Sequence, residues 1–143
     1  MRSPPLRSDW RWPAAALLAQ IAAIHIALIS QHLREAPYAA GLFIALSAAS
    51  LAVAARMLYR DDPPVWTAAG GLAAGAIVAY VLSRSIGLPM MSDDIGDWLN
   101  PLGVGAVCAE AITVALSLLV HRTAAATHPA GAPRPSPLAT GRA

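Results

Sequence analysis

A chain of 143 residues with 57% hydrophobic and 13% charged side chains departs from soluble domains, in which about a quarter of residues are charged. The mean hydropathy of +0.53 and the formal net charge of +2 exclude an acidic, well-solvated protein. All ten basic residues are arginine, and they flank apolar segments instead of forming one stripe. We therefore expect membrane lipid as the surroundings of the chain, and no nucleic-acid partner.

Four apolar windows are each long enough to cross a bilayer, which takes about 20 residues. The predicted spans cover residues 13–34, 40–59, 64–84 and 101–121. They predict an all-α fold, a four-transmembrane-helix bundle that occupies residues 13–121. Residues 1–12 form an N-terminal segment, and residues 122–143 lack an apolar face and are expected to be a disordered tail. The first span is too long and too polar inside, at Gln20 and His25, for a cleaved signal peptide.

The arginines predict the orientation of the bundle. With four alternating spans, Arg34 and Arg84 lie on one side of the membrane, and the other eight arginines lie on the side of both termini. Short cytoplasmic segments carry an excess of positive charge. We therefore expect both termini in the cytoplasm and a location in the bacterial cytoplasmic membrane.

Two ionisable residues lie deep in predicted spans. His25 is about ten residues from the outer end of the first span, or about 15 Å at 1.5 Å per residue. Glu110 is about nine residues into the last span from the same surface, or about 13–14 Å. Because ionisable groups in hydrocarbon are costly, we predict a His25–Glu110 contact, either as part of a functional site or as a structural clamp between helices.

The longest connection, residues 85–100, carries three aspartates. Asp93, Asp94 and Asp97 have the letters of the D-D-x-x-D magnesium motif of prenyl-chain enzymes, but that motif lies on a helix facing a large cavity. The other interpretation is a solvated loop whose aspartates pair with Arg34 and Arg84.

A metal or cation site near the outer surface is the functional interpretation of these groups. Imidazole with carboxylate suits zinc or another divalent transition ion, and the adjacent Met90 and Met91 favour copper. No ligand spacing is diagnostic, since H-x-x-x-H and C-x-x-C are both absent. The candidate ligands are His25, His32, Glu35, Asp93, Asp94, Asp97 and Glu110, supported by Arg84 and Trp98.

The third span contains a G-x-x-x-G pattern. Small residues at this spacing allow helix backbones to approach closely in lipid. Gly71 and Gly75 therefore predict packing inside the bundle or, alternatively, a homo-oligomer.

Two segments resemble those of small four-span integral membrane proteins of high-GC Gram-positive, actinobacterial-type bacteria. The first runs from His25 through His32-Leu-Arg-Glu-Ala-Pro-Tyr38, and the second from Ser83-Arg84 through Asp93-Asp94-Ile-Gly-Asp97-Trp98 to Glu110. The resemblance covers most of the chain up to His121. It implies four spans and carries over no functional residue.

The leading hypothesis is a non-enzymatic membrane protein with an outward-facing polar pocket that binds a cation or a partner protein. The first alternative is an ion or proton carrier that uses the His25–Glu110 pair. The second is a membrane enzyme that uses the acidic outer loop.

Overall fold

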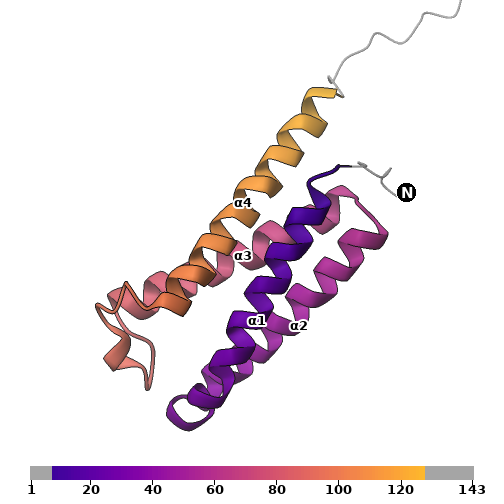
Figure 1. The fold of residues 1–143 in the computed structure, drawn as a ribbon. Coiled ribbons are helices and arrows are strands. Elements are labelled where there is room, and N and C mark those ends of the chain that lie inside the picture. The colour runs from indigo at the N-terminus through magenta and orange to yellow at the C-terminus, as the bar shows by residue number, and fades with distance from the viewer. Residues whose placement is uncertain (1–7, 128–143) are drawn as a thin grey trace, which may run out of the picture.

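The computed structural model describes residues 8–127 of the chain. Over this range the fold is all-α, as predicted, with four long helices and one short 3-10 turn. The elements are α1 (Arg11–Glu35), α2 (Pro37–Tyr59), α3 (Pro63–Ser85), η1 (Ser92–Asp94) and α4 (Pro101–Thr127). All four α-helices are long and apolar enough to span a membrane, which indicates a multi-pass membrane protein. Figure 1 shows that α1 begins and α4 ends at the same end of the bundle.

Local sequence sets the helix boundaries. The Asp62 carboxylate accepts a hydrogen bond from the Val65 backbone N–H at 3.3 Å and caps α3, whose first turn contains proline. Asn100 caps α4 in the same manner, with its Oδ1 3.3 Å from the Gly103 nitrogen. At the other turn, Pro37 opens α2 immediately after Ala36, so α1 and α2 are joined by a single residue.

The last helix is longer than the span predicted from the sequence. α4 continues past residue 121 to Thr127, so the first part of the predicted disordered tail is helical. The alanines at 124–126 explain the extension, because alanine has the highest helix propensity and nothing here breaks the helix. The rest of the predicted tail, residues 128–143, and the first seven residues lie outside the described part of the chain.

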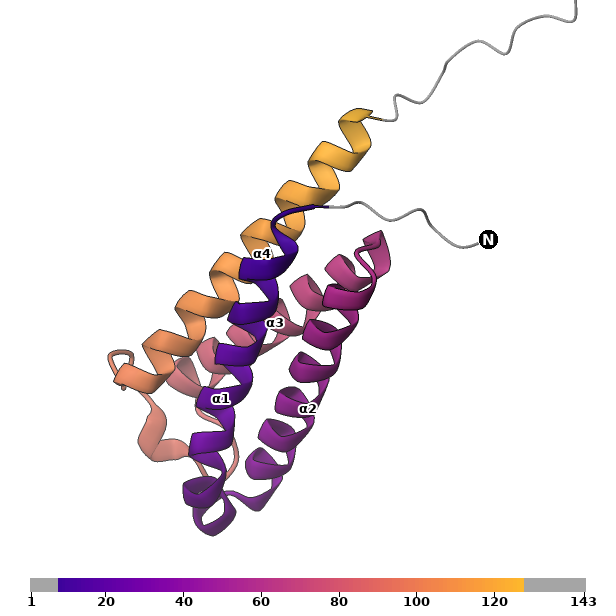
Figure 2. The same ribbon diagram turned by 45° about the vertical axis from the view of Figure 1, so that its right-hand side comes forward.

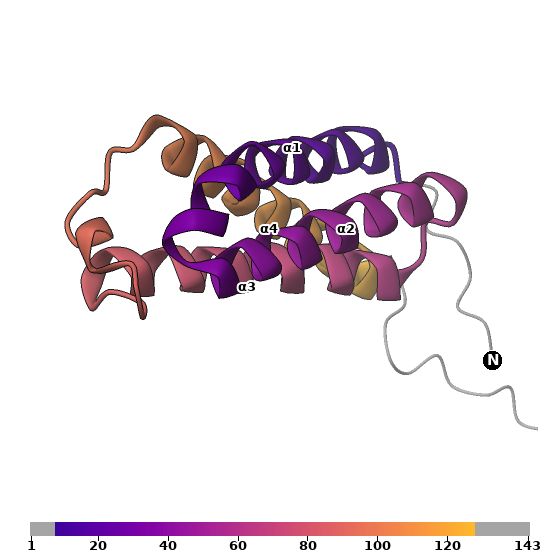
Figure 3. The ribbon, with the colours of Figure 1, turned by 90° about the horizontal axis from the view of Figure 1, so that it is seen from below.

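The helices form two hairpins, α1 with α2 and α3 with α4, which meet mainly through α1 and α4. Contact between α2 and α3 is the sparsest of these four pairings. The hairpins lie closest where α2 turns into α3 and diverge toward the end that holds η1 and the α1–α2 turn (Figures 1 and 2). Figure 3 shows η1 and the α1–α2 turn together at this end.

Most of the core lies in the half of the bundle near the α2–α3 turn. Trp66 is fully buried at its centre, packed among small and aliphatic side chains from all four helices. The cluster consists of Ala14, Ala15, Leu18, Ala54, Met57, Val65, Trp66, Ala69 and Val120. This half is therefore filled with apolar side chains, and the opposite half is where open space remains.

Two buried aspartates fasten the α2–α3 turn. The Asp61 carboxylate accepts hydrogen bonds from the Trp66 indole N–H at 2.6 Å and from the Ser8 backbone N–H. Asp62 pairs with Arg56 at 3.0 Å while it caps α3. These bonds tie the start of α1 and the end of α2 to α3, and the sequence analysis did not identify them.

Candidate functional site

A cavity of about 590 Å³ lies between the two hairpins, in the half of the bundle that contains η1. Cavities of this size, lined mostly by apolar side chains with a few polar groups, are typical of small-molecule sites. All four helices and the η1 loop contribute to its walls. The apolar wall residues include Leu28, Leu42, Phe43, Leu46, Leu72, Ala76, Leu88 and Val107.

Two histidines of α1 form one wall, and both pack against Phe43. The ring of Phe43 makes edge-to-face contacts with His25, at 5.0 Å between centroids, and with His32, at 4.7 Å. His25 and His32 are seven residues apart, which places both rings on one face of the helix, two turns apart. Phe43 is the single phenylalanine of the chain, and the sequence analysis did not assign it to the site.

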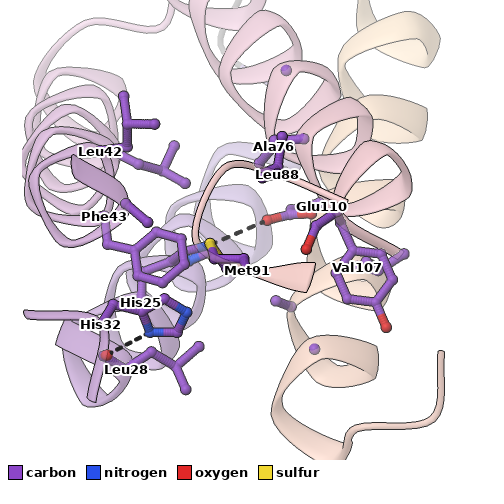
Figure 4. Close-up of a pocket in the computed structure, with 18 of the residues that line it drawn as sticks. His25, Leu28, His32, Leu42, Phe43, Ala76, Leu88, Met91, Val107 and Glu110 are labelled. Carbon is purple, nitrogen blue, oxygen red and sulfur yellow. Dashed lines mark hydrogen bonds and ion pairs between the residues drawn. The ribbon is translucent and has the colours of Figure 1, made fainter. Parts of the chain in front are cut away.

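The backbone of α1 determines which nitrogen of each histidine is free. Nδ1 of His25 lies 2.8 Å from the carbonyl oxygen of Ile21, and Nδ1 of His32 lies 2.9 Å from that of Leu28. A carbonyl oxygen only accepts, so Nδ1 must donate in both rings. In the neutral imidazole, Nε2 is then a hydrogen-bond acceptor. Figure 4 shows the His32–Leu28 bond and the two imidazoles beside Phe43.

Glu110 of α4 faces these rings from the opposite wall (Figure 4). Its Oε1 lies 4.0 Å from Nε2 of His25, so the two residues whose equal depth predicted a contact do face each other. The residue is only 1% exposed, and within residues 8–127 its carboxyl accepts no hydrogen bond. Because Glu110 lines the cavity, a molecule bound there can donate a hydrogen bond to this carboxyl.

Together, Glu110 and the two histidines present acceptor atoms to the cavity. When the histidines are neutral and Glu110 is ionised, the Glu110 carboxylate and both Nε2 atoms are acceptors. Their chemical complement is a group that only donates, and an ammonium group has three N–H donors and no acceptor. Phe43 adds an aromatic wall that is also favourable to a cation.

Among the described residues, one arginine, Arg84, lines the cavity; it lies near η1, and its charge is already paired. Nη1 of Arg84 lies 2.6 Å from Oδ1 of Asp94, and the guanidinium packs over the ring of Tyr80. Asp94 also accepts a hydrogen bond from Ser83 at 3.0 Å. Of the two arginines predicted to pair with the loop aspartates, Arg84 does so through Asp94.

Two further bonds hold the η1 loop against the helices. The Tyr38 hydroxyl donates to the carbonyl oxygen of Pro89 at 2.7 Å, which links the start of α2 to the loop. The Tyr80 hydroxyl donates to the carbonyl oxygen of Trp98 at 3.0 Å. The predicted supporting residue Trp98 therefore contributes its backbone and a ring contact with Tyr80, and its indole does not line this cavity.

The predicted metal ligands are not assembled into one centre. Among the described residues, no group of three or more histidine, cysteine, aspartate or glutamate side chains is placed to hold a metal ion. Asp94 is engaged by Arg84, Glu35 is exposed and accepts from Gln31 at 3.2 Å, and the loop carboxylates of Asp93 and Asp97 are exposed. The zinc or copper site expected from these residues is not supported.

The G-x-x-x-G glycines do not pack against another helix within the described chain. A Cβ built on Gly71 or Gly75 meets no atom within 4 Å, and both residues line the cavity. The close approach of α3 to α4 occurs instead at Gly70, where a Cβ would lie 2.7 Å from Oγ of Ser117. The prediction of internal packing by Gly71 and Gly75 is therefore wrong by one position, because the helix phase places Gly70 on the face toward α4.

Comparisons with family models, curated proteins and solved structures found no match to this chain.

Proposed function

We propose that this protein is a non-enzymatic, multi-pass membrane protein whose cavity binds a small organic cation, with Glu110 as its counter-ion. The observation that carries the proposal is the Glu110 carboxyl in the wall of a 590 Å³ cavity. Glu110 is 1% exposed, and among the described residues its carboxyl has His25 at 4.0 Å as a partner and accepts no hydrogen bond. A bound ammonium group donates hydrogen bonds to this carboxyl, and the pairing offsets part of the cost of desolvating both charges.

The same geometry favours an organic cation over the other occupants considered from the sequence. Zinc and copper require several ligands within about 2–2.3 Å of one point, and the described residues offer no such group. A partner protein presents a comparatively flat surface, whereas Glu110 lies beneath half-buried walls such as Phe43. A small molecule reaches such a group more readily than a protein surface does.

Binding also accounts for the structure better than conduction through a single copy. Beyond Glu110, the buried hydroxyls of α4 already donate to backbone carbonyls. Thr113 donates to Ala109 of the same helix at 2.8 Å, and Ser117 donates to Trp66 of α3 at 2.7 Å. The apolar cluster around Trp66 fills this half of the bundle. A carrier that uses the His25–Glu110 pair needs a rearrangement of this cluster, and a binding protein does not.

The membrane setting completes the proposal. With both termini in the cytoplasm, as the arginine distribution predicts, the cavity lies in the outer half of the bacterial cytoplasmic membrane. The resemblance to four-span proteins of actinobacterial-type bacteria supports the same proposal, because it indicates the type of membrane in which the site would act. The acidic loop then serves as the end wall of the cavity and carries no catalytic role.

The test compares n-octylamine with octan-1-ol, which has the same chain and no ammonium group. We expect one n-octylamine per chain, measured by native mass spectrometry of the detergent-purified protein, and little retention of octan-1-ol. Glu110→Gln removes the charge at nearly constant volume and should weaken amine binding at least about tenfold, or about 1.4 kcal/mol.

Asp97→Asn is the matched control, since it makes the same change on an exposed loop residue. Its affinity for n-octylamine should equal that of the native protein. Melting temperatures of all three proteins establish that the variants are folded. Equal binding by the native protein and Glu110→Gln would refute the role of Glu110, and no amine binding by any of them would refute the proposed function.

A further inference from the structure

One side of the cavity is open along the boundary between α2 and α3. On α3, Gly71 and Gly75 lie one helical turn apart, both are exposed, and both line the cavity. Ala79 continues the row by another turn and is also exposed. Along this row, α3 thus presents no side-chain atom beyond Cβ.

The facing edge of α2 is formed by Leu42 and Ala45, which also line the cavity while remaining exposed. Leu42 is 61% exposed. Both edges belong to helices with the length and composition of membrane spans, so this opening faces the acyl chains of the lipid. The cavity therefore joins two environments: an apolar slot open to the bilayer and a deep polar group at Glu110.

The slot is not explained by helix packing. A G-x-x-x-G pattern normally brings a second helix into backbone contact, yet nothing in the described chain comes within 4 Å of a Cβ built on either glycine. The residue of α3 that lies in close contact with α4 is Gly70, which is on a different face of the helix. Empty space beside two glycines fits an occupant that is long, thin and apolar.

Resting on the proposed function, we propose that the ligand is an amphiphilic amine with a linear hydrocarbon chain. Its ammonium group lies against Glu110, and its chain lies along Gly71 and Gly75 in the slot between α2 and α3. The chain stays in contact with lipid at the open edge, while the head group is withdrawn from lipid into the cavity.

The test separates the chain from the head group. Gly75→Leu fills the slot, and Gly41→Leu adds the same side chain to α2 at an exposed position with no atom within 4 Å of a built Cβ and no part in the cavity. Native mass spectrometry measures the affinities for n-butylamine and n-dodecylamine. We expect Gly75→Leu to weaken n-dodecylamine about tenfold and n-butylamine less than about twofold, and Gly41→Leu to change neither.

A second measurement covers the case in which Gly75→Leu fails to fold. Native protein is irradiated with a dodecylamine that carries a photoreactive group at its methyl end, and the labelled peptides are identified. Labels on residues 42–49 or 71–79 support the slot, and labels confined to other surfaces overturn it.

The outcomes also distinguish this inference from the function on which it rests. If Gly75→Leu weakens the binding of both amines equally, or leaves both affinities unchanged, the slot is overturned. A loss of amine affinity in Glu110→Gln would still support the cation site in that case. A native dimer that Gly75→Leu converts to monomer would show that a second copy of the chain fills the slot, and would overturn the inference as well. Insensitivity of every amine to Glu110→Gln would refute the role of Glu110, and no amine binding at all would refute the proposed function itself.

Discussion

Adjacent glycines on α3 provide the most direct test of the helix arrangement. A Cβ added at Gly70 would lie 2.7 Å from Oγ and 2.9 Å from Cβ of Ser117 on α4, which is closer than such atoms approach. Rotation of the serine hydroxyl relieves the first contact but not the second, so α3 and α4 must separate. At Gly71, one residue along the chain, the added Cβ meets nothing within 4 Å.

The expected magnitude follows from three contributions in Gly70→Ala. Overpacking of a tight interface costs about 1–3 kcal/mol. Displacement of Ser117 weakens its 2.7 Å hydrogen bond to the Trp66 carbonyl, worth about 0.6 kcal/mol in a membrane protein. The gain from replacing glycine by alanine in a helix is about 0.5–1 kcal/mol. The net loss in the free energy of unfolding is therefore about 1–3 kcal/mol.

Gly71→Ala has only the last contribution, so we expect it to be as stable as the native protein or up to about 1 kcal/mol more stable. Reversible unfolding in mixed micelles with increasing sodium dodecyl sulfate measures both variants against the native chain. If Gly70→Ala is as stable as Gly71→Ala, the close contact between α3 and α4 at Gly70 does not exist and the assigned helix phase is refuted.

Two further substitutions test the bonds that hold the ends of the bundle. Trp66→Phe removes the 2.6 Å bond to the buried Asp61 carboxylate and should lower the free energy of unfolding by about 1.5–3 kcal/mol. Trp98→Phe, at a 43% exposed position, should change it by less than about 0.5 kcal/mol. Equal losses in the two variants would contradict the role of the Trp66–Asp61 bond. Asp94→Asn weakens the 2.6 Å pair with Arg84 and should remove about 1 kcal/mol of local stability from the loop. Hydrogen exchange of the backbone amides in residues 86–100 should therefore become about fivefold faster. Unchanged exchange there would show that the pair does not hold the loop.

Local sequence was sufficient for the class of fold. The four spans follow from predominantly apolar windows of sufficient length. Their boundaries follow from Asp62, Asn100 and Pro37, which act within one or two turns of the backbone. The end of α4 was missed because the segment after His121 has no apolar face, which was interpreted as disorder although its alanines favour a helix. The depth of a residue along its span was predictable too, because the rise per residue of a helix is constant. The predicted depths placed His25 and Glu110 at the same level, and in the structure their side chains lie 4.0 Å apart.

Which helix faces contact one another across the bundle was decided by the tertiary structure alone. Depth does not specify rotation about the helix axis, and a rotation of about 100° per residue moves the contact with α4 from Gly71 to Gly70. The divergence of α2 from α3 opens the cavity, and the partners of Asp94 depend on how the η1 loop folds back on Arg84. These are relations between segments far apart in the chain, and helix periodicity carries no information about them. The sequence alone thus determined which ionisable groups lie within the apolar spans, and packing between helices determined that Glu110 faces the cavity.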